Sequence, residues 1–233
     1  TVHHQPLQGK ALLEAVLPAN ILVLMRDRTP LKKELIDQLP NLKYVIFTGN
    51  RNLAIDYVAL KERHIPVSFT EFGPSKETTV EITWTLILGA YKRLIEQNQL
   101  VKDGLWRNAY SVMPPLHGER LGVLGLGAIG GRVAQVGLAF GMDVVTWSPH
   151  MTPERAAAKG VKAVSLEELL ATSRIVTLHL VPGEGTRYLM DAKRLAMMRP
   201  DSLLVNTSRS ALIVTSDLLA ALKMQRPAMA ALD

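Results

Sequence analysis

The sequence of 233 residues contains no cysteine. This absence excludes disulfide bonds, thiol nucleophiles and cysteine-ligated zinc or iron–sulfur centres. The chain also lacks any apolar run near the ~20 residues that a membrane-spanning helix needs; its longest candidates are Ile82–Tyr91 and Leu121–Gly131. The segment Thr1–His4 has neither the basic nor the apolar region of a signal peptide. We therefore expect a cytoplasmic protein without a membrane partner.

Positive charge is in modest excess, and the basic residues are not clustered. The chain has 27 Lys and Arg residues against 21 Asp and Glu, which gives a formal net charge of +6. Proteins that bind nucleic acid usually gather their basic residues in a patch or stripe, whereas here they are spread along the chain. We therefore expect no nucleic-acid partner. We also expect no metal site. The composition, 48% apolar and 21% charged, is typical of a globular protein.

Short apolar segments alternate with segments of helical periodicity in the first third of the chain. Strands are predicted at Ile21–Met25, Tyr44–Phe47 and Val67–Phe69. Helices are predicted between them, at Leu31–Leu39 and Asp56–Arg63. The continuous apolar run of the first strand is typical of a strand buried on both faces. This order predicts parallel strands joined by helical crossovers.

A long helical stretch, roughly Glu77–Gln97, and a polar connection with Gly and Pro precede a second series of strands and helices. Its strands are predicted at Leu121–Leu124, Val144–Trp147, Ile175–Leu178 and Leu203–Val205. Its helices are predicted at Ile129–Phe140, Pro153–Lys159, Leu166–Ala171, Leu195–Met198 and Ser216–Lys223. We therefore predict an α/β protein with two doubly wound parallel-sheet domains, at residues 1–76 and 77–233.

The sharpest local signal is the segment Gly125-Leu126-Gly127-Ala128-Ile129-Gly130, a G-x-G-x-x-G pattern. It follows a predicted strand and opens a predicted helix, which is the context that a dinucleotide-binding turn requires. Gly125 permits the tight turn, Gly127 lets the backbone approach a pyrophosphate, and Gly130 allows close packing of helix and strand. The amino end of the helix offers free N–H groups to the phosphates. The second domain is therefore predicted to be Rossmann-like; the alternative is a glycine-rich turn with no ligand.

The residue that would distinguish NAD from NADP is predicted at the end of the next strand, about 20 residues beyond the glycines. Ser148 stands there. A carboxylate would bind the 2′-hydroxyl of NAD and repel the 2′-phosphate of NADP; a serine can bind a hydroxyl but does not repel a phosphate. The nearest cations are His150 and Arg155. We favour NAD, with NADP as the alternative.

Motifs along nearly the whole chain, in the right order, resemble the D-isomer-specific 2-hydroxyacid dehydrogenase family. In the second domain they are Gly125–Gly130, Ala139–Met142, Trp147–Pro149, Leu178–Val181, Met198–Pro200, Val205–Arg209 and Ala230–Asp233. In the first domain, Arg28–Pro30 and Thr48–Asn52 resemble the substrate-side loop. The resemblance implies that residues 1–76 form a smaller, flavodoxin-like substrate domain and that substrate lies in a cleft between the domains.

The resemblance implies that Arg209 is the catalytic arginine. It follows the predicted strand Leu203–Val205, at the carboxyl end where open α/β sheets bind ligands. A guanidinium can hold a substrate carboxylate with two hydrogen bonds and polarise the adjacent carbonyl. The alternative is a solvated arginine. Ser210 replaces the glycine that usually follows in the family, and Val214 replaces an aspartate often found there.

The resemblance also implies sets of cofactor-binding and substrate-binding residues. The cofactor-binding set is Gly125, Gly127, Ala128, Ile129, Gly130, Ser148, His179, Leu180, Val181, Thr207, Ser208 and Asp233. The substrate-binding set is Asn50, Arg51, Asn52 and Arg209. Asp233 matches the aspartate that contacts the nicotinamide carboxamide, and His179 matches a cofactor-side residue rather than the acid/base. The alternatives are a capping aspartate, a buried histidine and, for Asn50–Asn52, an ordinary polar turn.

The proton donor of the family has no counterpart in this sequence. The family uses a histidine held by a glutamate, and both lie downstream of the segment that Asp233 ends. The other histidines stand in no matching motif: His3, His4, His64, His117 and His150. The first strand of the family has no counterpart before Thr1. We therefore expect an internal portion of a longer enzyme, with domains incomplete at both termini.

These observations predict an oxidoreductase that transfers a hydride between NAD(P) and a small D-2-hydroxy acid or 2-oxo acid. The alternatives are a non-catalytic NAD-binding regulatory protein like the corepressors of the family, a formate or phosphite dehydrogenase relative, and a Rossmann-like domain with unrelated chemistry. The resemblance also implies a homodimer. Trp84, Trp106 and Ile82–Tyr91 are candidates for its contacts, with burial in the core as the alternative.

Overall fold

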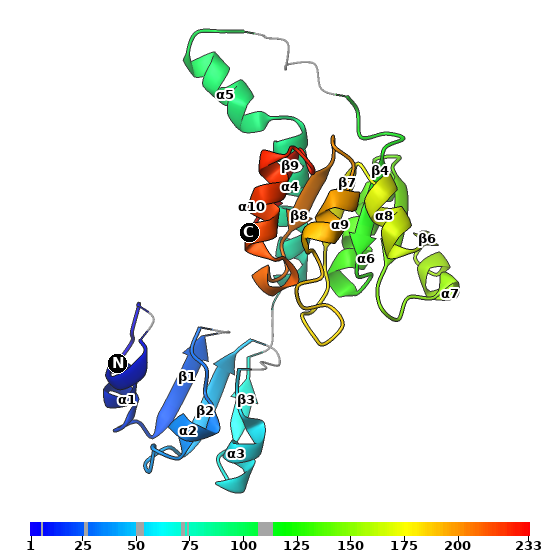
Figure 1. Cartoon of the computed structure of the whole chain (residues 1–233). Helices are drawn as coiled ribbons and strands as arrows, with labels where there is room; N and C mark the ends of the chain where they lie inside the picture. Colours follow the sequence, from blue (N-terminus) through cyan, green and yellow to red (C-terminus); the bar gives the residue numbers. More distant parts are fainter. Residues whose placement is uncertain (6, 26–27, 50–53, 71–72, 74, 107–113) are drawn as a thin grey trace. The chain divides into compact units, whose positions relative to one another are not determined.

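A computed structural model describes residues 1–5, 7–25, 28–49, 54–70, 73, 75–106 and 114–233 (Figure 1). The chain divides into two compact units, Thr1–Pro74 and Ser75–Asp233. Each unit contains a parallel sheet with helices between its strands, so the predicted α/β class is confirmed. Within the described residues, no helix is both long enough and apolar enough to span a bilayer.

The first unit contains a three-stranded parallel sheet in the order β1-β2-β3. Its strands are β1 (Ile21–Met25), β2 (Tyr44–Thr48) and β3 (Val67–Phe69). Its helices are α1 (Gly9–Val16), α2 (Lys33–Ile36) and α3 (Tyr57–Glu62). The short α2 replaces the longer predicted helix, because Leu31 instead forms a bridge with Ile55. Helix α1 was not predicted, since it has neither a capping side chain nor an acidic residue in its first turn.

Strand β1 is buried on one face only. Leu22 and Leu24 are buried, whereas Ile21, Val23 and Met25 are 56%, 63% and 54% exposed. The prediction of burial on both faces is therefore wrong for the described residues. The reason is the strand order: helices that connect neighbouring parallel strands in sequential order lie on the same face, since these crossovers are right-handed. Apolar side chains of α2 and α3 join the buried side chains of β1 in one core cluster.

The second unit contains a six-stranded parallel sheet in the order β6-β5-β4-β7-β8-β9. Its strands are β4 (Arg120–Leu124), β5 (Asp143–Trp147), β6 (Lys162–Ala163), β7 (Ile175–Leu178), β8 (Leu203–Asn206) and β9 (Met229–Leu232). The chain proceeds outward from β4 to β6 and then returns to place β7 beside β4. This reversal of strand order creates a switch point between β4 and β7, and ligands of open α/β sheets bind at such points.

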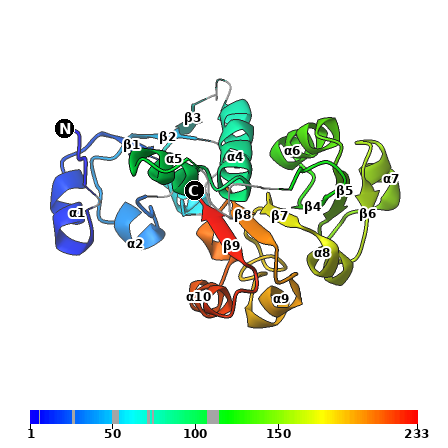
Figure 2. The same cartoon turned by 90° about the horizontal axis from the view of Figure 1, so that it is seen from above.

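Helices cover both faces of this sheet (Figure 2). On one side lie α4 (Ser75–Tyr91) and α6 (Ala128–Ala139); on the other lie α8 (Leu166–Thr172), α9 (Ala192–Met197) and α10 (Thr215–Lys223). Helix α7 (Pro153–Ala157) precedes the edge strand β6, and a short 3₁₀ helix spans Ser210–Leu212. Neighbouring strand residues therefore pack into different clusters: Val144 contributes to the cluster of α4 and α6, and Val145 to the cluster of α8 and α9.

The long helix predicted at Glu77–Gln97 is two helices. Helix α4 ends at Tyr91, and α5 spans Leu94–Lys102. Arg93 between them has a left-handed backbone, with φ of 50°, which no continuous α-helix accommodates. Trp84, Ile87 and Tyr91 of α4 are buried in the core. For these side chains the core alternative is therefore correct, while Trp106 is exposed.

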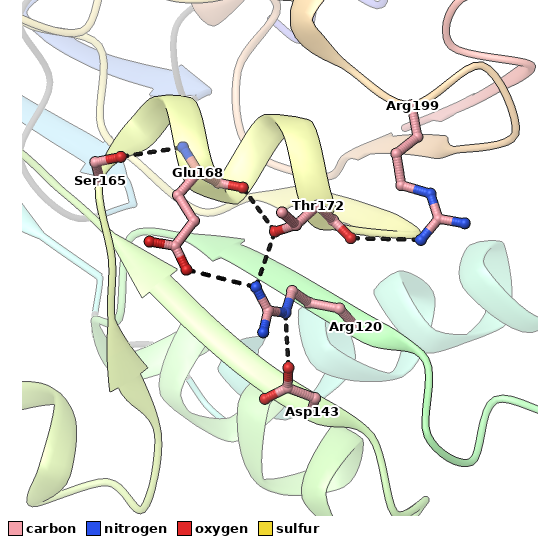
Figure 3. A network of polar contacts seen from close by, with 6 residues as sticks. All are labelled: Arg120, Asp143, Ser165, Glu168, Thr172 and Arg199. Atoms are coloured by element: carbon pink, nitrogen blue, oxygen red, sulfur yellow. Dashed lines mark hydrogen bonds and ion pairs between the residues drawn. The ribbon is translucent and has the colours of Figure 1, made fainter.

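A polar network ties the amino ends of β4 and β5 to α8 (Figure 3). Arg120 donates to Asp143 at 2.6 Å and to the Thr172 hydroxyl at 2.9 Å, and it lies 3.5 Å from the Glu168 carboxylate. Arg199 reaches the Thr172 carbonyl at 3.5 Å. The network lies at the edge of the sheet opposite the carboxyl ends of the strands. Its role is therefore structural, and its partly exposed ion pairs contribute modestly.

Candidate cofactor-binding and active site

The turn after β4 requires glycine at position 125. Gly125 has φ of +98°, a backbone conformation that L side chains rarely adopt. Its N–H donates to the Trp147 carbonyl at 2.9 Å, which joins the carboxyl ends of β4 and β5. A Cβ at this position would lie 2.7 Å from the His179 carbonyl oxygen. Both the conformation and the close approach of β7 therefore exclude a side chain.

Gly130 is required by the packing of α6 on this turn. A Cβ there would lie 1.9 Å from the carbonyl oxygen of Gly125, a distance that no real contact has. The helix can therefore start directly beneath the turn only because residue 130 has no side chain. This is the close helix–strand approach that the third glycine of the motif is expected to permit.

Gly127 differs because the protein's own packing does not require it to be a glycine. A Cβ there would meet no atom of the described residues within 4 Å, its φ of −75° suits any residue, and the residue is exposed. A side chain would instead enter the space in front of the amino end of α6. This open space fits the close approach of a phosphate group to the backbone.

The amino end of α6 is free to accept an anion. No side chain in the described ranges caps it, and its first turn has no acidic residue, whereas the side chains of Thr152, Ser165 and Asp191 cap α7, α8 and α9. The N–H groups of Ala128 and Ile129 belong to the first turn, whose amides have no acceptor within the helix. Together with the open space at residue 127, these donors fit the pyrophosphate of a dinucleotide.

A depression of about 640 Å³ adjoins this helix end and is basic. Its walls include Gly127, Ala128, Lys76, Arg132 and Lys159. Arg132 is paired with the Glu77 carboxylate. The two lysines are therefore the cations of this wall that add positive potential beside the proposed phosphate position.

His179 follows β7 at the switch point. Its backbone N–H donates to the Leu124 carbonyl at 2.8 Å, and its Nε2 lies 2.9 Å from the Thr177 hydroxyl. Burial without a nearby counter-charge lowers the pKa of His179 to about 4. The imidazole is therefore neutral at pH 7, and its place beneath the glycine turn is that of a supporting residue.

This pKa predicts a specific loss of stability in acid. Because the pKa of His179 is about 4 in the folded protein and 6.5 ordinarily, its neutral state contributes stability above pH 6.5 that is lost as pH falls towards 4. Between pH 7.5 and 4.5 the free energy of unfolding should fall by roughly 2–3 kcal/mol less in a His179→Asn variant than in the parent. Urea unfolding at pH 7.5 and 4.5 measures it. The exposed His150, changed to Asn, is the control; equal pH dependence in all three proteins would contradict the prediction.

The loop after β8 is held by the side chains that precede Arg209. The amide of Asn206 accepts from the Ser208 N–H at 2.9 Å and donates to the Arg209 carbonyl at 3.0 Å. The Ser208 hydroxyl donates to the Leu180 carbonyl at 2.6 Å, which ties the loop to the segment after β7. The buried Thr207 hydroxyl lies 2.7 Å from that of Thr83 in α4. The Asn206 side chain therefore braces the loop internally, while Ser208 and Thr207 anchor it to two other parts of the unit.

Arg209 itself is exposed at the end of this loop. Its Nη1 donates to the Ser208 carbonyl at 3.0 Å, and its own carbonyl accepts from Leu212 at 3.2 Å. The backbone is thus fixed on both sides while the guanidinium lies at the surface. The usual glycine is absent at Ser210, where the chain instead enters the 3₁₀ helix.

The remaining candidates of the second unit also follow strand ends. Ser148 is half-buried after β5, Leu180 is buried, and Val181 is exposed. Asp233 is exposed after β9, and its N–H donates to the Asn206 carbonyl at 3.1 Å. The structure thus gathers the second-unit candidates along one edge of one sheet. Asn50, Arg51 and Asn52 lie outside the described residues.

Two residues of this arrangement were not among the candidate side chains. Asn206 holds the loop, and its position between a buried strand and the sequence Thr-Ser-Arg was a usable signal, because Asn often hydrogen-bonds backbone two residues on. Thr83 lies in the middle of a helix, and no local pattern marks it. Its contact with Thr207 depends on the tertiary fold.

The sheet with a switch point, a glycine turn and an uncapped helix defines a dinucleotide-binding domain of the dehydrogenase type. The model of the "D-isomer specific 2-hydroxyacid dehydrogenase, NAD binding domain" matches residues 84–233. The chain therefore belongs to the D-isomer-specific 2-hydroxyacid dehydrogenase family, as its motifs predicted, and NAD is the cofactor of the matched domain.

Individual relatives agree with this assignment. A glyoxylate reductase of Aeropyrum pernix is 35% identical over 99% of this chain and 70% of its own length. The crystal structure of a phosphoglycerate oxidoreductase of Vibrio cholerae superposes with a TM-score of 0.87 at 32% identity, over 100% of this chain and 74% of that one. A D-lactate dehydrogenase of Aquifex aeolicus, solved with NAD and lactic acid, has a TM-score of 0.83 at 28% identity, over 96% and 67% of the two chains.

Proposed function

We propose that this protein interconverts a D-2-hydroxy acid and its 2-oxo acid with NAD as the hydride carrier. The observation that carries the proposal is the placement of Arg209. Its exposed guanidinium is held by an anchored loop at the same sheet edge as the glycine turn. A cation fixed at this edge can bind the carboxylate that every 2-oxo acid carries. The relative solved with NAD and lactic acid supports the same pairing of ligands.

The chain's own residues divide the work of binding and orientation. The backbone at Gly127, Ala128 and Ile129 would hold the pyrophosphate, Ser148 would bind the adenosine ribose, and Asp233 would bind the nicotinamide carboxamide. Val181, Leu180 and His179 would line the cofactor site. When bound, the nicotinamide supplies or accepts the hydride.

Arg209 orients the substrate. The planar guanidinium grips the carboxylate with two hydrogen bonds and stabilises the charge that develops on the adjacent carbonyl oxygen. The neutral, hydrogen-bonded His179 is not the proton donor in this proposal. The proton donor that the family uses, a histidine held by a glutamate, stays a prediction for this protein.

Three broader expectations stay predictions as well. The substrate-domain role of residues 1–76 is one, and a cytoplasmic location, with which the lack of cysteine is compatible, is another. A homodimer is the third. Helix α5 supports it, because no residue of α5 is buried and its apolar side chains Leu94, Ile95 and Val101 are exposed.

The direct test uses the full-length protein with a panel of 2-oxo acids. Glyoxylate, hydroxypyruvate, pyruvate and larger analogues are each mixed with NADH or NADPH, and the loss of reduced-nicotinamide absorbance is followed. We expect turnover of at least one acid with NADH. Binding of NADH by calorimetry without turnover of any acid would favour a regulatory protein, and absence of NADH binding would overturn the cofactor assignment.

A Gly127→Ala variant tests the cofactor site separately. We expect its free energy of unfolding to change by less than ~1 kcal/mol, because the new methyl group meets no atom in the described part of the chain and alanine is only a poorer helix cap. Its Kd for NADH should rise about 10-fold or more, equivalent to about 1.4 kcal/mol, because the methyl group occupies the space of the phosphates. Calorimetry with NADH measures the change; an unaltered Kd would place the pyrophosphate elsewhere.

A further inference from the structure

A buried pair of hydroxyl groups joins helix α4 to the loop that carries Arg209. Thr83 is 0% exposed and Thr207 is 8% exposed, and their Oγ1 atoms lie 2.7 Å apart. The two residues are 124 positions apart in the chain. Buried hydroxyls require hydrogen-bond partners, and among the described residues Thr83 supplies the partner of the Thr207 hydroxyl.

The direction of this hydrogen bond follows from the neighbours of Thr83. The Thr83 hydroxyl donates to the Thr79 carbonyl at 2.7 Å, and a hydroxyl has only one proton. The proton between the two threonines therefore comes from Thr207. The Thr207 hydroxyl thus donates to Thr83 and has no proton left to donate to a cofactor.

Asn206, Thr207 and Ser208, the three residues before Arg209, each make a side-chain hydrogen bond that holds the loop. The bond of Thr207 is made with Thr83 of α4. The Asn206 amide fixes the loop to itself, and the Ser208 hydroxyl fixes it to the segment after β7. The hydrogen bond at Thr207 instead reaches across to a helix on the face of the sheet. Helix α4 begins at Ser75, where the second unit begins.

We propose that Thr83 is a positioning residue for Arg209, acting through the hydroxyl of Thr207. This inference rests on the proposed role of Arg209 in holding the substrate. Loss of the Thr83 hydroxyl leaves the Thr207 proton without its acceptor and frees one of the three anchors of the loop. The guanidinium then spends less time in the orientation that grips the substrate, while the phosphate-binding turn after β4 is unaffected.

The test compares Thr83→Val, Thr83→Ser and Thr85→Val in the full-length protein. For Thr83→Val we expect kcat with the preferred 2-oxo acid to fall by on the order of 10-fold, since small displacements of positioning groups have effects of this size or larger. The KM for NADH should stay within about twofold. Thr83→Ser keeps the hydroxyl and should restore the parent kcat. Thr85→Val is the matched control, because exposed Thr85 makes the same bond to the carbonyl four residues earlier, Glu81, at 2.8 Å.

A double-mutant cycle with Arg209→Ala separates this inference from the proposal beneath it. In the Arg209→Ala background, Thr83→Val should change kcat by less than about twofold, because two groups that act through one interaction are not additive. An equal loss in both backgrounds would make Thr83 merely structural. Parent-like activity of Thr83→Val beside an impaired Arg209→Ala would overturn the inference alone, whereas a fully active Arg209→Ala would overturn the proposed function.

A second variant covers the outcome in which Thr83→Val does not fold. Thr83→Val/Thr207→Val replaces both hydroxyls with methyl groups of similar shape, so neither is left buried without a partner. We expect this protein to fold and, at saturating NADH, to show a kcat reduced by on the order of 10-fold, as for Thr83→Val. A parent-like kcat in this folded variant would also overturn the inference.

Discussion

Replacement of Arg209 with alanine is expected to lower kcat by roughly 10²–10³-fold, the usual effect of losing one electrostatic stabiliser of a developing charge. The residue lies at the surface with its backbone fixed from both sides. Its truncation should therefore remove the guanidinium, with its bond to the Ser208 carbonyl, and leave the Asn206 and Ser208 side-chain bonds of the loop in place. The KM for the 2-oxo acid should rise as well, because the substrate carboxylate loses its partner.

A binding measurement and a second variant serve as controls for this prediction. The Kd for NADH, from calorimetry, should stay within about twofold of the parent value, since the phosphate-binding turn is formed by other residues. Arg209→Lys keeps the charge but lacks the planar fork, and we expect it to recover only a minor part of the lost turnover. Activity of Arg209→Ala within twofold of the parent would refute the role assigned to this residue.

The parts of the fold that local sequence determines were predictable. Strands β1, β3 and β7 have the predicted bounds, because each is a short, mainly apolar segment followed by a polar residue. The glycine motif also predicted the tight turn after β4 and the start of α6. The requirements at Gly125 and Gly130 arise from contacts only a few residues away along the chain or in the adjoining strand.

The parts that depend on tertiary contacts were not predictable. The exposed face of β1 follows from the order of strands in the sheet, which the apolar run of β1 does not encode. The separation of α4 from α5 depends on the left-handed backbone of one arginine, Arg93. The hydroxyl pair of Thr83 and Thr207 joins two segments that no local periodicity connects. In this site the groups that touch ligands are local motifs, and the groups that position them come from distant segments.

Gly130→Ala should be the most damaging single-methyl substitution in the cofactor turn. The added Cβ would lie 1.9 Å from the Gly125 carbonyl oxygen and 3.2 Å from the Cβ of His179. Because the first of these neighbours is backbone, no side-chain rotation relieves the overlap, and α6 must move away from the turn. We expect a loss of about 3 kcal/mol or more in the free energy of unfolding, the upper range for overpacked sites.

The adjacent glycine provides a matched control for this substitution. Beyond its chain neighbours and the adjacent turns of α6, the nearest described atom to a Cβ at Gly131 would be the Leu126 carbonyl oxygen, at an ordinary contact distance of 3.8 Å. Gly131→Ala should therefore raise stability by roughly 0.5–1 kcal/mol through helix propensity and leave the Kd for NADH unchanged. Urea unfolding and NADH calorimetry on both variants measure the contrast. If Gly130→Ala proved as stable as Gly131→Ala, the close approach of α6 to the turn would be wrong, and with it the geometry on which the phosphate site depends.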